Sequence, residues 1–124
     1  MTTDRLFLVT AAILGLLAVA GGAFGAHALR SRLTPDMLET FETGIRYQMY
    51  HALALGGVGI LVDRYSATSI VTAGWLFILG TVIFSGSLYV LTLTGTRWWG
   101  AVTPFGGLAL LGGWGSLIWG VVRS

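Results

Sequence analysis

The chain has 124 residues, of which 55% are hydrophobic and 10% are charged, and its mean hydropathy is +0.82. This length allows one domain, and this composition excludes an ordinary soluble globular domain. The pI near 9.5 comes from seven arginines against five acids without a basic run, so it indicates anchoring at membrane edges rather than nucleic-acid binding. The absence of cysteine excludes disulfides, thiolate catalysis and thiolate metal sites.

The first predicted element is a transmembrane helix over residues 6–28, a stretch without any charged side chain. Its apolar run exceeds the usual core of a signal peptide, so we expect it to be retained. Small residues recur at four-residue spacing along it, which lets helix backbones approach closely in lipid. We therefore expect Gly21, Gly22 and Gly25 to pack against a neighbouring helix.

The second predicted helix, residues 35–62, begins with a capping hydroxyl at Thr34 and a proline at Pro35. Its first part is amphipathic and should lie at the membrane surface, with Gly44 as the expected bend into the bilayer. At about 100° per residue, polar and apolar side chains of this part fall on opposite arcs. The polar arc holds Glu39, Glu42, Thr43, Arg46, Tyr47, Tyr50 and His51.

A short turn at residues 63–66 precedes the third predicted helix, residues 69–94. Thr103 and Pro104 repeat the capping pattern before the fourth, residues 104–122. The sequence therefore predicts an all-α integral membrane four-helix bundle, one domain over residues 1–124, with an amphipathic interfacial lead-in to the second helix. After the first helix, the expected packing positions are Gly56 in the second helix, Gly86 in the third, and Gly112, Ser116 and Gly120 in the fourth.

Four antiparallel spans would bring the ends of the first and third helices and the starts of the second and fourth to one side of the bilayer. His51 is expected near the midplane, since about 18 Å of helix separates it from Asp63. An ionisable side chain at that depth is costly and should face protein or trapped water. The candidates for a polar cavity or binding site are His51, Arg46, Tyr47, Gln48, Tyr50, Glu42, His27, Ser85, Ser87, Tyr89 and Thr103.

Two interpretations of these candidates stay open. They form either a polar cavity open to one side of the membrane or a buried hydrogen-bond network that fixes the register of short helices. For His27, three residues before Arg30, an interfacial or structural role is favoured. Ser85 and Ser87 more often serve helix packing than chemistry.

We predict no catalytic residue, metal site or cofactor. Haem ligation by His27 and His51 is disfavoured because these residues should lie at different depths, and a metal site would need a third ligand. No acid lies deep in a span and no nucleophile elbow is present, which disfavours a hydrolase. We therefore expect no enzymatic activity.

Four runs of the chain resemble a known family. They are residues 21–29 (GGAFGAHAL), 42–53 (ETGIRYQMYHAL), 84–89 (FSGSLY) and 103–107 (TPFGG). Together they resemble the bacterial membrane-protein family known as domain of unknown function 423, whose eukaryotic relatives are called transmembrane protein 256. The resemblance covers nearly the whole chain and implies a small multipass protein of the plasma (inner) membrane, without an established activity.

Two other families of small four-helix membrane proteins are less similar. The glycine-rich run at residues 21–26 is similar to the first helix of the dual-topology fluoride channels, but the chain has no asparagine for their pore. Small multidrug exporters use a buried glutamate in the first helix, and residues 6–28 contain no carboxylate.

The leading functional hypothesis is permeation or transport of a small polar solute or ion through a polar half-membrane vestibule, with Arg46 supplying positive charge and His51 a proton site. The competing hypothesis is a non-enzymatic accessory or scaffolding protein that binds a protein partner or lipid. The expected partners are the lipid bilayer, a second copy of the chain and a membrane-protein partner, but not nucleic acid. Arginines flank both sides of the spans almost equally, so the positive-inside rule does not fix the orientation.

Overall fold

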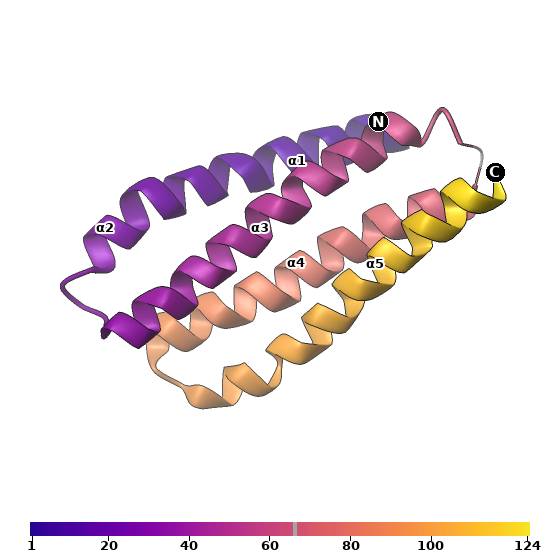
Figure 1. Ribbon diagram of the computed structural model, residues 1–124. Coiled ribbons are helices and arrows are strands. Elements are labelled where there is room, and N and C mark those ends of the chain that lie inside the picture. The colour runs from indigo at the N-terminus through magenta and orange to yellow at the C-terminus, as the bar shows by residue number, and fades with distance from the viewer. Residues whose placement is uncertain (66) are drawn as a thin grey trace.

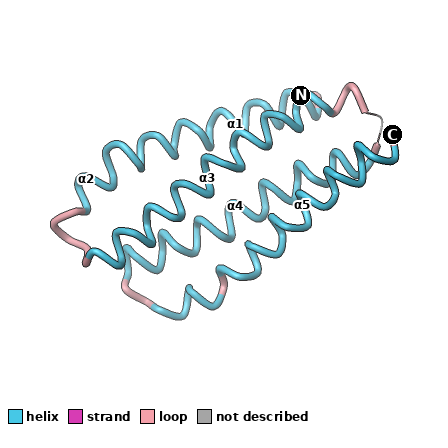
Figure 2. Tube along the Cα trace, in the orientation of Figure 1, coloured by secondary structure: helices cyan, strands magenta, loops and turns pink. Residues whose placement is uncertain are grey.

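The computed structural model describes residues 1–65 and 67–124, and it consists of helices joined by short turns (Figures 1 and 2). The first rod comprises α1 (Thr3–Ala20), a π-helical turn (Gly21–Gly25) and α2 (Ala26–Leu29). Then follow α3 (Pro35–Leu61), α4 (Thr68–Thr94), a 3₁₀ turn (Arg97–Ala101) and α5 (Thr103–Arg123). Of the turn predicted at residues 63–66, Ser66 lies outside the described residues.

The helices form an antiparallel bundle in which α1 and α5 are the outer members. In the described part of the chain the extensive contacts join α1 to α3, α3 to α4, and α4 to α5. As Figure 1 shows, α2, the start of α3, the end of α4 and the start of α5 gather at one end of the bundle, whereas both termini lie at the other end. The topology therefore matches the antiparallel arrangement expected from the sequence.

Three helical stretches within residues 1–65 and 67–124 are long and apolar enough to cross a membrane: Thr3–Leu29, Thr68–Thr94 and Arg97–Arg123. The 27-residue helix α3 is not among them, because its first half carries ionisable side chains. It nevertheless packs against both α1 and α4, so the bundle holds it at the depth of its apolar neighbours. The predicted all-α membrane helical bundle is confirmed.

The start of α3 follows the predicted capping pattern, but its middle does not follow the predicted bend. Thr34 Oγ1 accepts a hydrogen bond from the Met37 amide at 3.2 Å, and Pro35 is the first helical residue. The helix is continuous through Gly44. A Cβ at Gly44 would lie 2.8 Å from Tyr89 Cε1, so this glycine allows a close approach of α4 rather than a bend.

The start of α5 differs from the prediction that Thr103 caps it. Thr103 is itself helical, the preceding Val102 has right-handed helical dihedrals, and no side chain caps the helix. The Thr103 hydroxyl oxygen instead lies 2.6 Å from the Ser87 hydroxyl oxygen and 3.3 Å from the Trp99 carbonyl oxygen. The 3₁₀ turn before α5 places this threonine toward α4, so a repeated Thr-Pro pair does not produce a repeated cap.

The main cluster of buried apolar side chains and most of the buried polar side chains lie toward opposite ends of the bundle. The apolar core lies toward the end that holds the termini and comprises Phe7, Leu55, Val58, Ile70, Ala73, Phe77 and Leu110. The buried polar side chains lie near the middle or toward the other end, and they are Gln48, His51, Thr81, Ser85, Ser87 and Thr92. This division places polar chemistry where α3 starts and α4 ends.

Most of the small residues expected at helix contacts do lie against a neighbour. A Cβ would meet atoms of another helix within 4 Å at Gly21, Gly22, Gly25, Gly56, Gly112 and Gly120, and Ser116 is half-buried. Gly86 differs, because a Cβ there would meet nothing within 4 Å. The closest approach to the backbone of a neighbouring helix is at Gly106, which was not among the predicted packing positions: a Cβ there would overlap the backbone nitrogen and Cα of Phe84.

Gly106→Ala should destabilise the bundle by about 1–3 kcal/mol, the usual cost of overpacking, because the backbone of Phe84 cannot rotate aside. Gly86→Ala is the matched control on α4 and should be neutral or stabilising by up to about 1 kcal/mol, since alanine favours a helix over glycine. Unfolding of both variants in detergent measures the difference. An equal loss of stability in the two would contradict the α4–α5 contact.

Candidate functional site

Gln48 is buried, at 6% exposure, and its side-chain amide joins three helices. From α3, its Nε2 donates to the Leu14 carbonyl oxygen of α1 at 2.8 Å. Its Oε1 accepts from the Tyr89 hydroxyl of α4 at 2.6 Å. A helical carbonyl has a second lone pair, so Leu14 can accept this bond beside its own helical one. One amide therefore links α1, α3 and α4.

Ser85 makes a second connection between α3 and α4, one turn from Tyr89. Its side chain is 1% exposed, and its Oγ donates to the Gly44 carbonyl oxygen at 2.6 Å. The missing side chain at Gly44 lets the two helices come close enough for this bond. The hydroxyl is thus satisfied in an interior where an unpaired one would be costly.

His51 is buried, at 5% exposure, between α3 and α5. Its Nδ1 lies 2.8 Å from the Tyr47 carbonyl oxygen, and its Nε2 accepts from the Trp114 indole Nε1 at 3.1 Å. Because a carbonyl only accepts and an indole N–H only donates, both contacts fit the neutral tautomer with its hydrogen on Nδ1. Both ring nitrogens are therefore engaged by the protein.

Ser87 and Thr103 connect α4 to α5 nearer the bundle end. Their hydroxyl oxygens are 2.6 Å apart, and Ser87 Oγ donates its single hydrogen to the Phe84 carbonyl oxygen at 2.8 Å, so Thr103 is the donor within the pair. This pair and the bonds of Gln48, Ser85 and His51 connect each helix with its neighbours. The structure thus brings six predicted site residues into interhelical hydrogen bonding: Gln48, His51, Ser85, Ser87, Tyr89 and Thr103.

Other predicted site residues lie outside these bonds. Arg46 is exposed, and its Nη2 donates to Thr43 Oγ1 within the same helix at 3.2 Å. Tyr50 is 53% exposed, Glu42 is half-buried, and His27 is exposed on α2. The Arg46 guanidinium and the His51 imidazole therefore occupy different environments, one on the outer face of α3 and one inside the bundle.

Tyr47 lies between these two environments. Its side chain is 39% exposed, its ring stacks on Phe84 with centroids 4.6 Å apart, and its backbone carbonyl receives His51. It thereby covers one side of the imidazole from the outside.

Trp114 is the main residue that sequence reasoning missed. It lies in the middle of α5 rather than at its ends, where a membrane-interface tryptophan would be expected. That position was an available signal, because an indole N–H held at mid-membrane depth needs an acceptor within the protein. The Leu14 and Gly44 carbonyls gave no signal, since backbone acceptors look alike in a sequence. Thr81 Oγ1 is a buried hydroxyl without a partner among the described residues.

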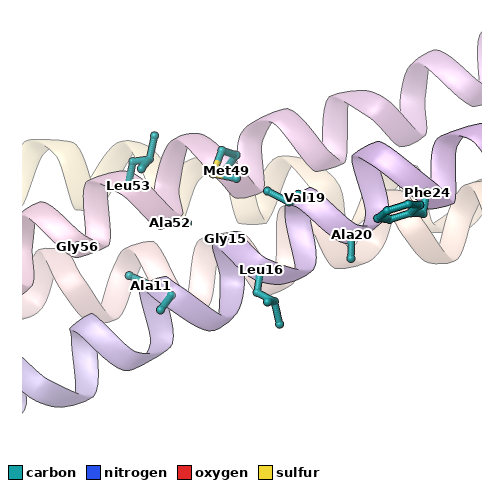
Figure 3. A pocket seen from close by; sticks show the side chains of 11 residues that line it. Ala11, Gly15, Leu16, Val19, Ala20, Phe24, Met49, Ala52, Leu53 and Gly56 are labelled. Atoms are coloured by element: carbon teal, nitrogen blue, oxygen red, sulfur yellow. The ribbon is translucent and has the colours of Figure 1, made fainter.

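Two open grooves lie on the outside of the bundle. The α1/α3 groove has a volume of about 840 Å³ and an almost wholly apolar lining from α1, the π-helical turn and α3 (Figure 3). The α3/α5 groove has about 530 Å³ and is lined by Tyr47, His51, Phe84 and Trp114 among apolar neighbours. Within residues 1–65 and 67–124, no group of three His, Asp or Glu side chains could hold a metal ion.

The Gln48–Tyr89 bond should contribute measurably to stability. We expect Tyr89→Phe to lower the free energy of unfolding by about 0.5–1.5 kcal/mol, because Gln48 Oε1 would lose its donor. In a double-mutant cycle with Gln48→Leu, the two substitutions should be non-additive by a similar amount. Tyr50→Phe is the control on an exposed tyrosine and should change stability by less than about 0.5 kcal/mol. Strict additivity would contradict the bond.

The His51–Trp114 bond has a spectroscopic signature. In histidine-labelled protein in nanodiscs, ¹⁵N NMR should show His51 with hydrogen on Nδ1 and a hydrogen-bonded Nε2. Trp114→Phe keeps an aromatic ring but removes the indole donor, so it should shift the Nε2 resonance and leave exposed His27 unchanged. A wild-type His51 that carries its hydrogen on Nε2 would contradict this geometry.

The comparisons with known proteins agree on one family. The profile of the protein family of unknown function DUF423 matches residues 21–107. The UPF0382 membrane protein YwdK of Bacillus subtilis is 44% identical over 120 residues, which cover 96% of this chain and 98% of the relative. The UPF0382 inner membrane protein YgdD of Escherichia coli K12 is 40% identical over 121 residues, which cover 98% and 92%.

No solved structure matches the chain. The family match spans the π-helical turn, all of α3 and α4 and the start of α5, and so includes every residue of the interhelical bonds except Leu14 and Trp114. The relatives are named as membrane or inner membrane proteins, as expected for a multi-pass protein of the plasma membrane. The chain therefore belongs to the DUF423 family of membrane proteins, which the sequence resemblance had indicated.

Proposed function

We propose that this protein is a non-enzymatic accessory protein of the membrane that binds lipid on its outer surface. One observation carries the proposal: apart from the Thr81 hydroxyl, the buried polar side chains of the described chain are bonded to one another or to backbone carbonyls, while the α1/α3 and α3/α5 cavities are open grooves on the outside. A permeation path needs polar groups that are free to replace the hydration of a solute. The Gln48 amide, the Ser85 hydroxyl and the His51 imidazole are engaged instead in bonds between helices.

The outer grooves suit an apolar occupant. The α1/α3 groove is lined by small and apolar side chains such as Gly15, Val19, Met49 and Leu53, which Figure 3 shows along its two walls. Binding sites for hydrophobic molecules are concave and predominantly apolar. In a helix bundle surrounded by bilayer, the apolar molecule in greatest supply is a lipid acyl chain.

The outer helices also leave room for protein partners. Only 11% of the apolar window of the α1 rod and 22% of that of α5 are buried within the chain. A second copy of the chain or another membrane protein, both expected from the sequence, would find its largest free surfaces there.

Permeation is the second candidate, and the position of His51 and Tyr47 in the wall of the α3/α5 groove favours it. A solute that moved along this groove would pass a hydroxyl and an imidazole about halfway through the bilayer. This candidate requires the Trp114–His51 bond to open, because both ring nitrogens are engaged when it is closed.

Flux through proteoliposomes separates the two candidates. Liposomes that hold the purified protein should pass protons, potassium, chloride and glycerol no faster than empty liposomes, because the interior offers no free polar path. His51→Ala and Arg46→Ala should leave that background unchanged. A protein-dependent flux that His51→Ala abolishes, in a variant that still purifies as a folded protein, would overturn the accessory role and support permeation.

A further inference from the structure

The outer face of α3 carries charges at a depth where only lipid surrounds the protein. Glu39 and Arg46 are exposed and Glu42 is half-buried. At 1.5 Å per residue α3 is about 40 Å long, against a hydrocarbon core of about 30 Å, so about 5 Å projects at each end of an upright helix. The Arg46 Cα then lies roughly 11 Å inside the hydrocarbon boundary, counted from Pro35.

These three charges form a strip. At about 100° per residue, Glu39, Glu42 and Arg46 lie within roughly 60° of arc. Side chains of a helix lean toward its N-terminus, so the Arg46 guanidinium reaches back toward the membrane surface. Its Nη2 bonds Thr43 Oγ1, three residues nearer the N-terminus, so the group is turned toward the membrane surface. The strip therefore presents, from the bilayer interior outward, one cation and then two anions.

A phospholipid with a zwitterionic headgroup has the complementary order of charge. Its phosphate lies nearer the acyl chains and its ammonium lies farther out. Arginine binds phosphate through its planar fork of donors, and carboxylates accept hydrogen bonds from an N–H donor. A primary ammonium can donate such bonds to Glu42 and Glu39, whereas a trimethylated ammonium has no N–H to donate.

The α1/α3 groove adjoins this strip on its deeper side. Met49 and Leu53, which line the groove, follow Arg46 by about one and two helical turns. Leu53 is 69% exposed and its side chain extends away from the ribbon in Figure 3, so it forms the rim between groove and strip. An acyl chain in the groove would thus place its headgroup at the charged strip.

Resting on the lipid-binding role proposed above, we infer that the α1/α3 groove and the strip Glu39, Glu42 and Arg46 form one binding site for a phospholipid with a primary-ammonium headgroup, phosphatidylethanolamine. Arg46 holds the phosphate, Glu42 and Glu39 receive the ammonium, and the groove holds an acyl chain.

Native mass spectrometry of the full-length protein, exchanged into an equimolar mixture of phosphatidylethanolamine, phosphatidylglycerol and phosphatidylcholine with identical acyl chains, tests the site. The wild type should retain phosphatidylethanolamine in preference to the other two. Arg46→Gln should lower retention of all three about tenfold, because each has a phosphate, and Glu42→Gln should reduce phosphatidylethanolamine alone to the level of phosphatidylcholine. Arg30→Gln and Asp36→Asn are matched controls at exposed positions outside the strip and should change nothing.

The outcomes separate this inference from the function on which it rests. Retained lipid without headgroup preference, or a preference that Glu42→Gln leaves intact, would overturn the phosphatidylethanolamine site and leave lipid binding standing. A wild type that retains none of the three lipids would overturn both. Arg46→Lys keeps the positive charge and should restore much of the retention, which distinguishes a phosphate contact from a folding defect.

Discussion

Lipid cannot satisfy a polar atom, so every donor and acceptor inside this bundle must find its partner within the protein. Apart from the Thr81 hydroxyl, the buried polar side chains of the described chain meet this constraint, mainly by bonding backbone carbonyls and one another across helix boundaries. Gln48 reaches α1 and α4, Ser85 reaches α3, and Trp114 reaches His51. These directional bonds fix the axial register of each helix relative to its neighbour, which apolar packing alone specifies weakly.

Close packing makes these bonds possible. The Ser85 hydroxyl reaches the Gly44 carbonyl because no side chain stands between α3 and α4 at that point. At Gly106, too, the absence of a side chain allows α5 to pack against the backbone of Phe84. Small residues and polar side chains therefore act together. Glycines allow two helices to approach closely, and nearby hydroxyl and amide groups then bond to the backbone carbonyls that have come within reach. The helices are closely packed where these bonds form, and the α1/α3 and α3/α5 grooves lie on the outside of the bundle.

Much of this architecture follows from the sequence alone. The apolar stretches, the cap at Thr34 and the gathering of polar residues at one end all depend on local pattern and helix geometry. The spacing of about 100° per residue also placed the polar side chains of α3 on one arc, but it does not show which of these side chains face the other helices. The structure divides it: His51 turns inward, whereas Arg46 and Tyr50 face outward. Pairings such as His51 with Trp114 and Thr103 with Ser87 depend on tertiary contacts that no local pattern encodes.

The central claim is that the interior is closed to water, and the native absence of cysteine allows a direct measurement. Thr81 is buried, and its hydroxyl has no hydrogen-bond partner in the described chain. Thr81→Cys therefore places a thiol inside the bundle without removing a hydrogen bond. In proteoliposomes, a small charged methanethiosulfonate should leave this thiol unmodified under conditions that fully label a cysteine at exposed Thr2. Labelling of position 81 at a rate close to that of position 2 would contradict the account.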